Sequence, residues 1–314
     1  MFTLIVRRLL QMVVVMFVVA TAVFVAFRLM PGNPALMALG LNYTKAAYVA
    51  LEKQMGLSKP VYVQYVIWMV HLIQGNLGTS SQTGLPVLPL VLSKAGITLV
   101  LAAVGMGLGI IVAIPLGVYS AVHAGKTADQ VFRVFSMIGY SMPSYWLGVL
   151  LMLLFAVKLR VLPAGGYAPL SGGLWQYAQF LVLPACTVAL MQAAPLMRFL
   201  RASMLDVLHH DFVRTARSKG LSERVVIYKH ALRNALVPLI TASALNMGAL
   251  IGGLVVTEQV YAWPGIGWEL VQSIFNRDYN IVEGIVIISA FAFVLANLLA
   301  DVLYAVVDPR ITYQ

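Results

Sequence analysis

The sequence predicts an all-α integral membrane protein, and three observations lead to that class. Hydrophobic residues make up 61% of the 314 residues and charged residues only 10%, whereas soluble domains carry roughly 25% charged residues. Long uncharged runs recur, each long enough to cross the apolar core of a bilayer as a helix. Polar residues gather between these runs. One bundle of six transmembrane helices is therefore expected, although length alone would suggest two soluble domains.

The first apolar run resembles a secretory signal peptide. Arg7 and Arg8 precede it, and Ala20-Thr21-Ala22 resembles a small-residue cleavage site. However, 19 uncharged residues follow one another from Leu9 to Phe27, which is enough to span a bilayer. Residues 1–30 are therefore predicted to be a retained N-terminal transmembrane helix, ended by a Pro-Gly-Asn-Pro breaker.

The next 65 residues, 31–95, form a mixed segment that we expect on the outer side of the membrane. Within it, the aromatic and apolar run at 61–73 predicts an interfacial or packed helix, and 75–86 predicts a loop. Residues 96–305 then form a five-helix core, followed by a tail at 306–314. The core helices are expected at 97–122, 134–157, 180–197, 234–257 and 284–305. The second of them is expected to be broken by a turn at 141–144, where Pro143 predicts a kink.

Positive charge orients the bundle. With six helices, both termini share a side with the 120–133 and 198–233 loops, and that side carries 13 of the 21 Lys and Arg residues. Cytoplasmic loops carry an excess of Lys and Arg, so both termini and these loops are predicted to face the cytosol. The net charge of +10 is explained by this asymmetry, and no nucleic-acid partner is expected.

The sequence contains no convincing catalytic, metal or nucleotide site, so we do not expect an enzyme. Carboxylates that would mark an ion-coupled transporter are absent from the centres of the predicted spans. Asp301 lies in the last turns of the sixth helix, where a helix-end or interhelical partner is expected. Three polar side chains inside spans are candidates for the translocation path, although interhelical packing is the preferred explanation for each one taken singly: Gln192, Ser243 and Asn246. Energy for uphill transport would have to enter from a partner.

Residues 198–233 form the most basic polar segment, with eight of the 21 Lys and Arg. Asp211 is expected to cap a short helix that Gly220 ends, and Ser222 to cap a second helix. Phe212, Val213 and Ala216 fall on one face of the first helix. Such an apolar face with a basic rim suits a groove on another protein, and it equally suits anionic lipid headgroups.

This segment resembles the EAA loop of ABC importer permeases, in the form carried by the dipeptide, oligopeptide and nickel family. The resemblance implies that the segment docks on a partner ATPase, and it covers Asp211, Phe212, Val213, Arg214, Thr215, Ala216, Arg217, Ser218, Lys219, Gly220 and Leu221. Phe212 replaces the usual tyrosine. The sequence His230-Ala231-Leu232-Arg233-Asn234-Ala235 and Pro238 continue the match.

The resemblance extends along nearly the whole chain. Matching segments include Met30-Pro31-Gly32-Asn33-Pro34, Gly139-Tyr140-Ser141-Met142-Pro143, Arg201-Ala202-Ser203-Met204-Leu205 and Trp263-Pro264-Gly265-Ile266-Gly267. It implies a six-helix type I ABC importer permease in a bacterial inner membrane. Trp263, Pro264 and Gly265 would then lie at the outer mouth of the pore.

The same resemblance implies the partners and the cargo. The partners are a homologous second permease, two cytosolic ABC ATPases that hold the ATP and Mg²⁺, and a binding protein that delivers substrate. This chain itself is expected to bind no cofactor. Peptides are the expected cargo, with a nickel chelate or glutathione as alternatives. An ion-driven transporter and a passive scaffold are the rivals from other classes.

Overall fold

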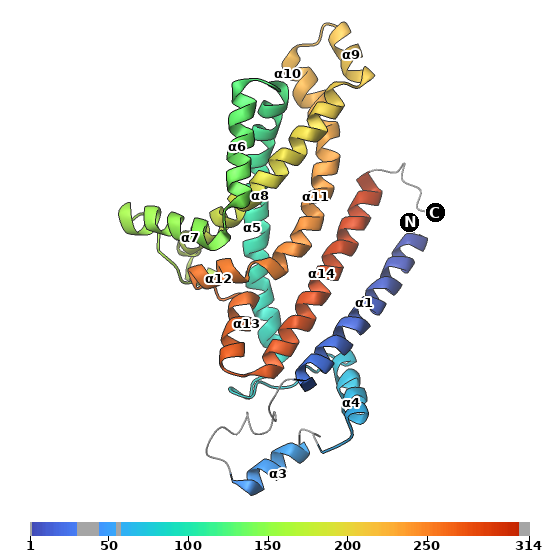
Figure 1. Ribbon diagram of the computed structural model, residues 1–314, viewed down its shortest axis with the longest axis vertical. Coiled ribbons are helices and arrows are strands. Elements are labelled where there is room, and N and C mark those ends of the chain that lie inside the picture. The colour runs from blue at the N-terminus through green and yellow to red at the C-terminus, as the bar shows by residue number, and fades with distance from the viewer. Residues whose placement is uncertain (1, 30–43, 55–57, 308–314) are drawn as a thin grey trace.

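The protein is an all-α bundle, as expected (Figure 1). The computed structural model describes residues 2–29, 44–54 and 58–307. In this part of the chain, five helices are long and apolar enough to cross a membrane, and a bent helix pair makes a sixth span if its halves are counted together. The fold class is confirmed. The presence of six spans and the location of residues 31–95 on the outer side of the membrane remain predictions.

The helices follow one another with short connections. Before the core lie α1 (Phe2–Leu29), α3 (Lys45–Gln54) and α4 (Val61–Ile73). The first part of the core contains α5 (Val87–Val122), α6 (Thr127–Ser141), α7 (Ser144–Met152) with a π-helical end at Leu153–Lys158, and α8 (Leu174–Leu208). The second part contains α9 (Asp211–Ser218), α10 (Glu223–Val225) with the π-helical Val226–Ala231, α11 (Leu232–Gly253), α12 (Val255–Tyr261), α13 (Ile266–Phe275) and α14 (Tyr279–Val307).

Two helices extend well beyond their predicted ends and continue past charged residues. The sequence places the second span at 97–122, but α5 begins ten residues earlier and includes Lys94, which pairs with Glu269 at 3.2 Å. The fourth span, expected at 180–197, continues to Leu208 and includes Arg201, which is also paired. Lys and Arg are good helix formers, so a charge ends an apolar run without ending the helix, and apolar runs underestimate helix length here.

The predicted kink at Pro143 is a complete break. The α6 and α7 helices meet at 102°, and Pro143 occupies the N-cap position of α7 with φ −63° and ψ 139°. Proline disfavours helical backbone at the residue before it, and Met142 is extended accordingly. The predicted break at 141–144 is confirmed, whereas the predicted start at 134 is wrong, because α6 begins at Thr127.

The α5 and α8 helices form the centre of the core, and glycine lets them approach closely. A Cβ atom at Gly105 would lie 2.5 Å from Val188 Cγ1, and one at Gly117 would lie 3.1 Å from Leu200 Cβ. Small residues permit such contacts between membrane helices. The prediction that the glycine-rich second span is an interior helix is confirmed.

The stretch at 258–283 lies between the expected spans at 234–257 and 284–305 and would therefore be a loop, but most of it is helical. It contains the end of α12, all of α13 and the first residues of α14. In Figure 1 these elements lie toward the end of the bundle opposite α9, where α3 and α4 also lie. Two sequence predictions fall partly outside the described residues: the 31–95 segment, at 31–43 and 55–57, and the tail, at 308–314.

Candidate functional site

The α9 helix projects from one end of the bundle, beyond the ends of α5, α6, α8 and α11 (Figure 1). Its start differs from the expectation. His210 occupies the N-cap position, and Asp211 is the first helical residue, with its carboxylate 3.4 Å from the Arg214 guanidinium. A carboxylate in the first turn is favoured by the helix dipole, so Asp211 supports the helix by charge and not as its cap.

The two faces of α9 have different environments. Val213 and Ala216 are buried and join the main core together with Val226 and Ala231. Phe212, by contrast, is 40% exposed. The expectation that Phe212, Val213 and Ala216 form one outward apolar face is therefore wrong. Valine and alanine attach the helix to its own chain, which leaves Phe212 as the large apolar side chain available to a partner.

The end of α9 follows the sequence prediction. Gly220 has φ +73°, a left-handed conformation that glycine adopts at the least cost. Its amide donates to Arg217 O at 2.9 Å, and the Leu221 amide donates to Ala216 O at 3.4 Å. Bonds of this kind satisfy the last carbonyls of a helix. Ser222 follows at the N-cap position of α10, as predicted.

A buried ion pair anchors the helices that lead to α9. Arg201 of α8 donates two hydrogen bonds of 2.7 Å to the carboxylate of Asp129 in α6. The same carboxylate accepts from Ser120 Oγ of α5 at 2.6 Å and from the Gly125 amide at 3.0 Å. Bidentate guanidinium–carboxylate pairs are strong and directional. This arrangement, here called the Asp129 clamp, ties α5, α6 and α8 together seven residues before α8 ends.

The opposite half of the bundle contains a second buried carboxylate, Glu258 of α12. It accepts from Thr98 Oγ1 of α5 at 2.6 Å and from the Trp268 amide at 2.9 Å. Thr98 Oγ1 also accepts from the Ile266 amide at 2.8 Å. Burial raises the pKa of the Glu258 carboxyl, and these hydrogen bonds oppose that effect. Glu258 thus holds the N-terminal turn of α13 against α5.

Trp263, Pro264 and Gly265 form the turn between α12 and α13, which we call the Glu258 turn. Trp263 and Gly265 are buried and Pro264 is half-buried. Trp263 packs edge-on against Tyr167 with ring centroids 5.0 Å apart. A Cβ atom at Gly265 would overlap the Glu258 carboxylate and the Thr98 hydroxyl. These residues serve the internal packing of this turn, and their place at the pore mouth stays a prediction.

The three path candidates lie in different environments. Ser243 is buried and donates to Leu239 O of its own helix at 2.8 Å, so it is satisfied internally. Gln192 is half-buried beside Gly109, and Asn246 is half-buried on α11. The structure does not bring these three side chains into one cluster through any hydrogen bond between described residues.

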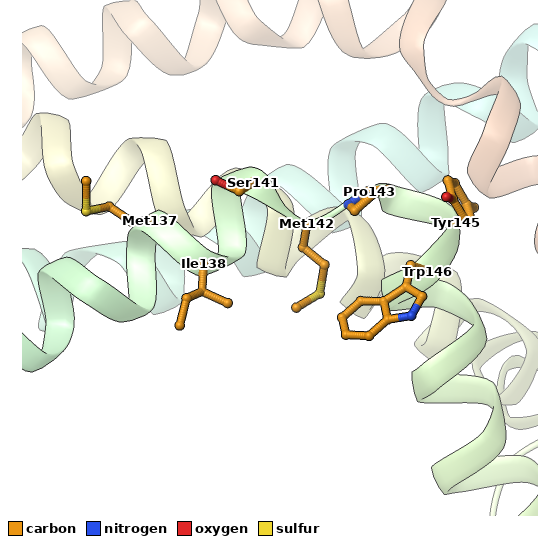
Figure 2. A pocket seen from close by; sticks show the side chains of 7 residues that line it. All are labelled: Met137, Ile138, Ser141, Met142, Pro143, Tyr145 and Trp146. Atoms are coloured by element: carbon orange, nitrogen blue, oxygen red, sulfur yellow. The ribbon is translucent and has the colours of Figure 1, made fainter.

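A shallow cavity of about 630 Å³, widely open to the surroundings, lies at the α6–α7 bend. Figure 2 shows Ile138, Met142 and Trp146 on one side of the bend, while Met137 and Ser141 point the other way. The lining is almost entirely apolar. Among the described residues, no group of three His, Cys, Asp or Glu side chains gathers in a way that could hold a metal ion.

Comparison with known sequences gives the family. Residues 113–313 match the family described as the binding-protein-dependent transport system inner membrane component, and residues 1–103 match the N-terminal family of such components. The chain belongs to this family. It is an ABC transporter permease, and its predicted role as a transport subunit is confirmed.

Relatives of this permease align from end to end. The oligopeptide transport system permease protein AppB of Bacillus subtilis is 38% identical over 98% of this chain and 99% of its own length. A probable peptide ABC transporter permease of Sinorhizobium fredii is 38% identical over 98% of this chain and 99% of its own length. The glutathione transport system permease protein GsiC of Salmonella choleraesuis is 37% identical over 98% of each chain.

Solved structures share the permease fold. A chain of the MetNI methionine ABC transporter in inward-facing conformations superimposes with a TM-score of 0.54 at 19% identity, covering 70% of this permease and 96% of that chain. A chain of an amino acid ABC transporter gives a TM-score of 0.50 at 15% identity, covering 71% of this permease and 94% of that chain.

Sequence reasoning missed two residues of this permease, Asp129 and Glu258. Both were placed in loops, where carboxylates are normally solvated, and both are buried. Arg201 lies in a segment that was recognised from its motif. Its partner, Asp129, lies 72 positions earlier, and nothing in the sequence around Asp129 indicated that the two residues pair. For Glu258, the glycines at 265 and 267 were the available signal, because they leave room for a side chain from elsewhere.

Proposed function

We propose that this permease forms half of a translocation path for peptides, and that partner ATPases drive it through α9. The observation that carries the proposal is the two-sided environment of α9. Its inner face is attached to the core by Val213 and Ala216, while Phe212 and the basic side chains remain exposed. A helix attached on one side and exposed on the other can transmit force from a docked partner.

The attachment suggests how movement would spread. Val213 and Ala216 belong to the same core as Val226 and Ala231, which lead directly into α11. On the other side, α9 follows α8 after two residues. The Asp129 clamp then connects α8 to α5 and α6. Displacement of α9 would therefore shift four core helices, changing the populations of inward- and outward-open states.

The assembly would contain a homologous second permease, two ABC ATPases and a binding protein. ATP and Mg²⁺ would bind to the ATPases, where hydrolysis would occur. The excess of Lys and Arg on one side supports a bacterial inner-membrane protein with cytosolic termini and cytosolic α9. Trp263, Pro264 and Gly265 would then lie in the outer half of the permease.

Peptides are the proposed cargo because the relatives named above include oligopeptide and peptide transport permeases. Glutathione, itself a tripeptide, is the second candidate, supported by the similarity to GsiC. A nickel chelate remains an alternative from the resemblance of the sequence alone. Identification of the binding protein, followed by measurement of what it binds, would distinguish these three classes of cargo.

Substitution of Gly220 tests the role of α9. Gly220→Pro should abolish ATP-driven uptake in proteoliposomes of the assembled transporter, because proline fixes φ near −65° where this position has +73°. Gly220→Asn is the matched control, since asparagine tolerates left-handed backbone, and it should retain uptake. Normal uptake by an assembled Gly220→Pro transporter would contradict the proposal. Uptake by the purified chain without ATP would support an ion-driven transporter instead.

A further inference from the structure

One face of α8 is left uncovered by the rest of the chain. The α8 helix is the most buried of the five spans, packing against α5, α6, α7, α11 and α12. Residues separated by three, four and seven positions share a helix face. The uncovered face contains Pro195, Arg198, Phe199, Ala202 and Asp206, of which all but the half-buried proline are exposed.

Arg198 on this face has an aromatic support and an available charge. Its guanidinium carbon lies 4.7 Å from the centroid of the Tyr140 ring of α6. Within residues 2–29, 44–54 and 58–307, no carboxylate lies within ion-pair distance of Arg198. Arg201, one turn further along α8, is fully engaged by Asp129. The two arginines of α8 thus differ: Arg201 holds helices together, whereas the charge of Arg198 is available to a ligand.

The chemistry of this face excludes lipid tails as its surroundings. An arginine in a membrane span normally faces the interior of the bundle or a water-filled cavity. The exposed face of α1 has the opposite character, since Leu10, Val13, Val14 and Phe17 are all apolar. The position of Arg198 on this face of α8 therefore indicates a polar space beside it.

The apolar lining of the α6–α7 bend begins next to Tyr140, the residue whose ring supports Arg198. Tyr140 immediately precedes Ser141 and Met142, which line the cavity at the α6–α7 bend together with Met137 and Trp146 (Figure 2). Methionine is unbranched and flexible, so it adapts to apolar groups of different shapes. The ring that supports Arg198 and the first residues that line the apolar space, Tyr140 and Ser141, thus follow one another in α6.

We propose that Arg198 binds a carboxylate of the transported peptide, held in place by the Tyr140 ring, while the adjoining cavity accepts the apolar side chains of the peptide. The inference rests on the proposed function, because every peptide with a free C-terminus carries this group. The guanidinium fork matches a carboxylate with two parallel hydrogen bonds. A lysine ammonium cannot reproduce that geometry or the stacking on Tyr140.

Paired peptides test the assignment in proteoliposomes that contain the whole transporter and its binding protein. The two peptides share an apolar sequence and end in either a carboxylate or an amide, and both are supplied at concentrations that saturate the binding protein. Arg198→Gln should slow uptake of the acid by roughly tenfold or more, the effect of one lost charged hydrogen-bond pair. It should leave uptake of the amide within about twofold, because the amide offers no charge to lose.

Matched variants separate charge from packing. Arg198→Lys should retain part of the acid uptake, Tyr140→Phe should retain most of it because the ring remains, and Tyr140→Leu should lose more. Arg7→Gln, at an exposed arginine of α1, should leave the uptake of both peptides unchanged.

Each other outcome has a separate meaning. If the wild-type transporter imports neither peptide, the proposed function fails. If it imports either peptide but Arg198→Gln slows both equally, or neither, the carboxylate assignment is overturned. Loss of the second permease from the purified Arg198→Gln assembly would overturn it too, since Arg198 would then belong to an interface between subunits.

Discussion

The α9 helix and the Glu258 turn lie in opposite halves of the permease and are held in opposite ways. Only Val213 and Ala216 of α9 are buried, and its ion pairs are exposed. Around the Glu258 turn, the Thr98 hydroxyl donates to the Glu258 carboxylate inside the protein. The Ile266 amide donates to the Thr98 hydroxyl, and the Trp268 amide donates to the Glu258 carboxylate. One region therefore offers its groups to a partner, whereas the other uses them to fix its own shape.

This difference predicts where a substitution acts. Changes in the Glu258 turn should reduce the stability of the permease before any partner binds. Changes on the outer face of α9 should leave stability intact and weaken assembly with the ATPases.

The largest effect is expected for Gly265→Ala. The added methyl group would overlap Glu258 and Thr98, so overpacking and loss of a buried hydrogen bond act together. We expect the free energy of unfolding to fall by about 3 kcal/mol or more, measured by thermal denaturation of the purified chain in detergent. Gly107→Ala is the control, because a methyl group there meets open space among the described residues. Equal stability of the two variants would contradict the internal role of this turn.

The hydrogen bond between Thr98 and Glu258 should give the next largest effect. Thr98→Val and Glu258→Gln should each lower the free energy of unfolding by about 1–3 kcal/mol, because each leaves a buried partner unsatisfied. The double variant should lose less than the sum of the two, by roughly 1 kcal/mol, since the same contact is removed twice. Strict additivity in a double-mutant cycle would show that the two side chains act independently.

Substitutions at two neighbouring residues of α9 should have different effects, one on the stability of the permease and the other on its assembly with the ATPases. Val213→Ala removes two buried methyl groups and should lower the free energy of unfolding by about 1.5 kcal/mol. Phe212→Ala should change it by no more than about 0.5 kcal/mol, yet weaken binding of the ATPases roughly tenfold or more if this ring is the anchor. Denaturation of the chain and a pull-down with the ATPases measure the two quantities. Unchanged ATPase binding by Phe212→Ala would remove Phe212 from the docking surface.

The smallest effect is expected for Glu223→Gln, which removes the exposed ion pair with Arg217 at 2.9 Å. Exposed pairs contribute at most about 1 kcal/mol, and salt screens them further. The difference in denaturation temperature between wild type and variant should therefore be small at low salt and disappear at high salt. A loss comparable to that of Thr98→Val would show that the α9 region depends on internal polar bonds after all.

Local features of the sequence were sufficient to predict much of the fold. Uncharged runs located the centres of the long helices, since the bilayer requires apolar length. Gly220 was recognised as a helix end because left-handed backbone is a property of one residue. The bend at Pro143 was recognised for a similar local reason, although its 102° angle was underestimated.

Features that depend on distant partners were not predictable in this way. The sequence by itself determined the membrane class, the family and the position of the α9 segment, because composition, motif and glycine placement are local. Only the tertiary structure decided that Asp129 and Glu258 are buried, that α5 and α8 continue past charged residues, and that Val213 and Ala216 face inward. Burial of a charge depends on which side chain arrives opposite it, and for Asp129 that side chain, Arg201, lies 72 positions away.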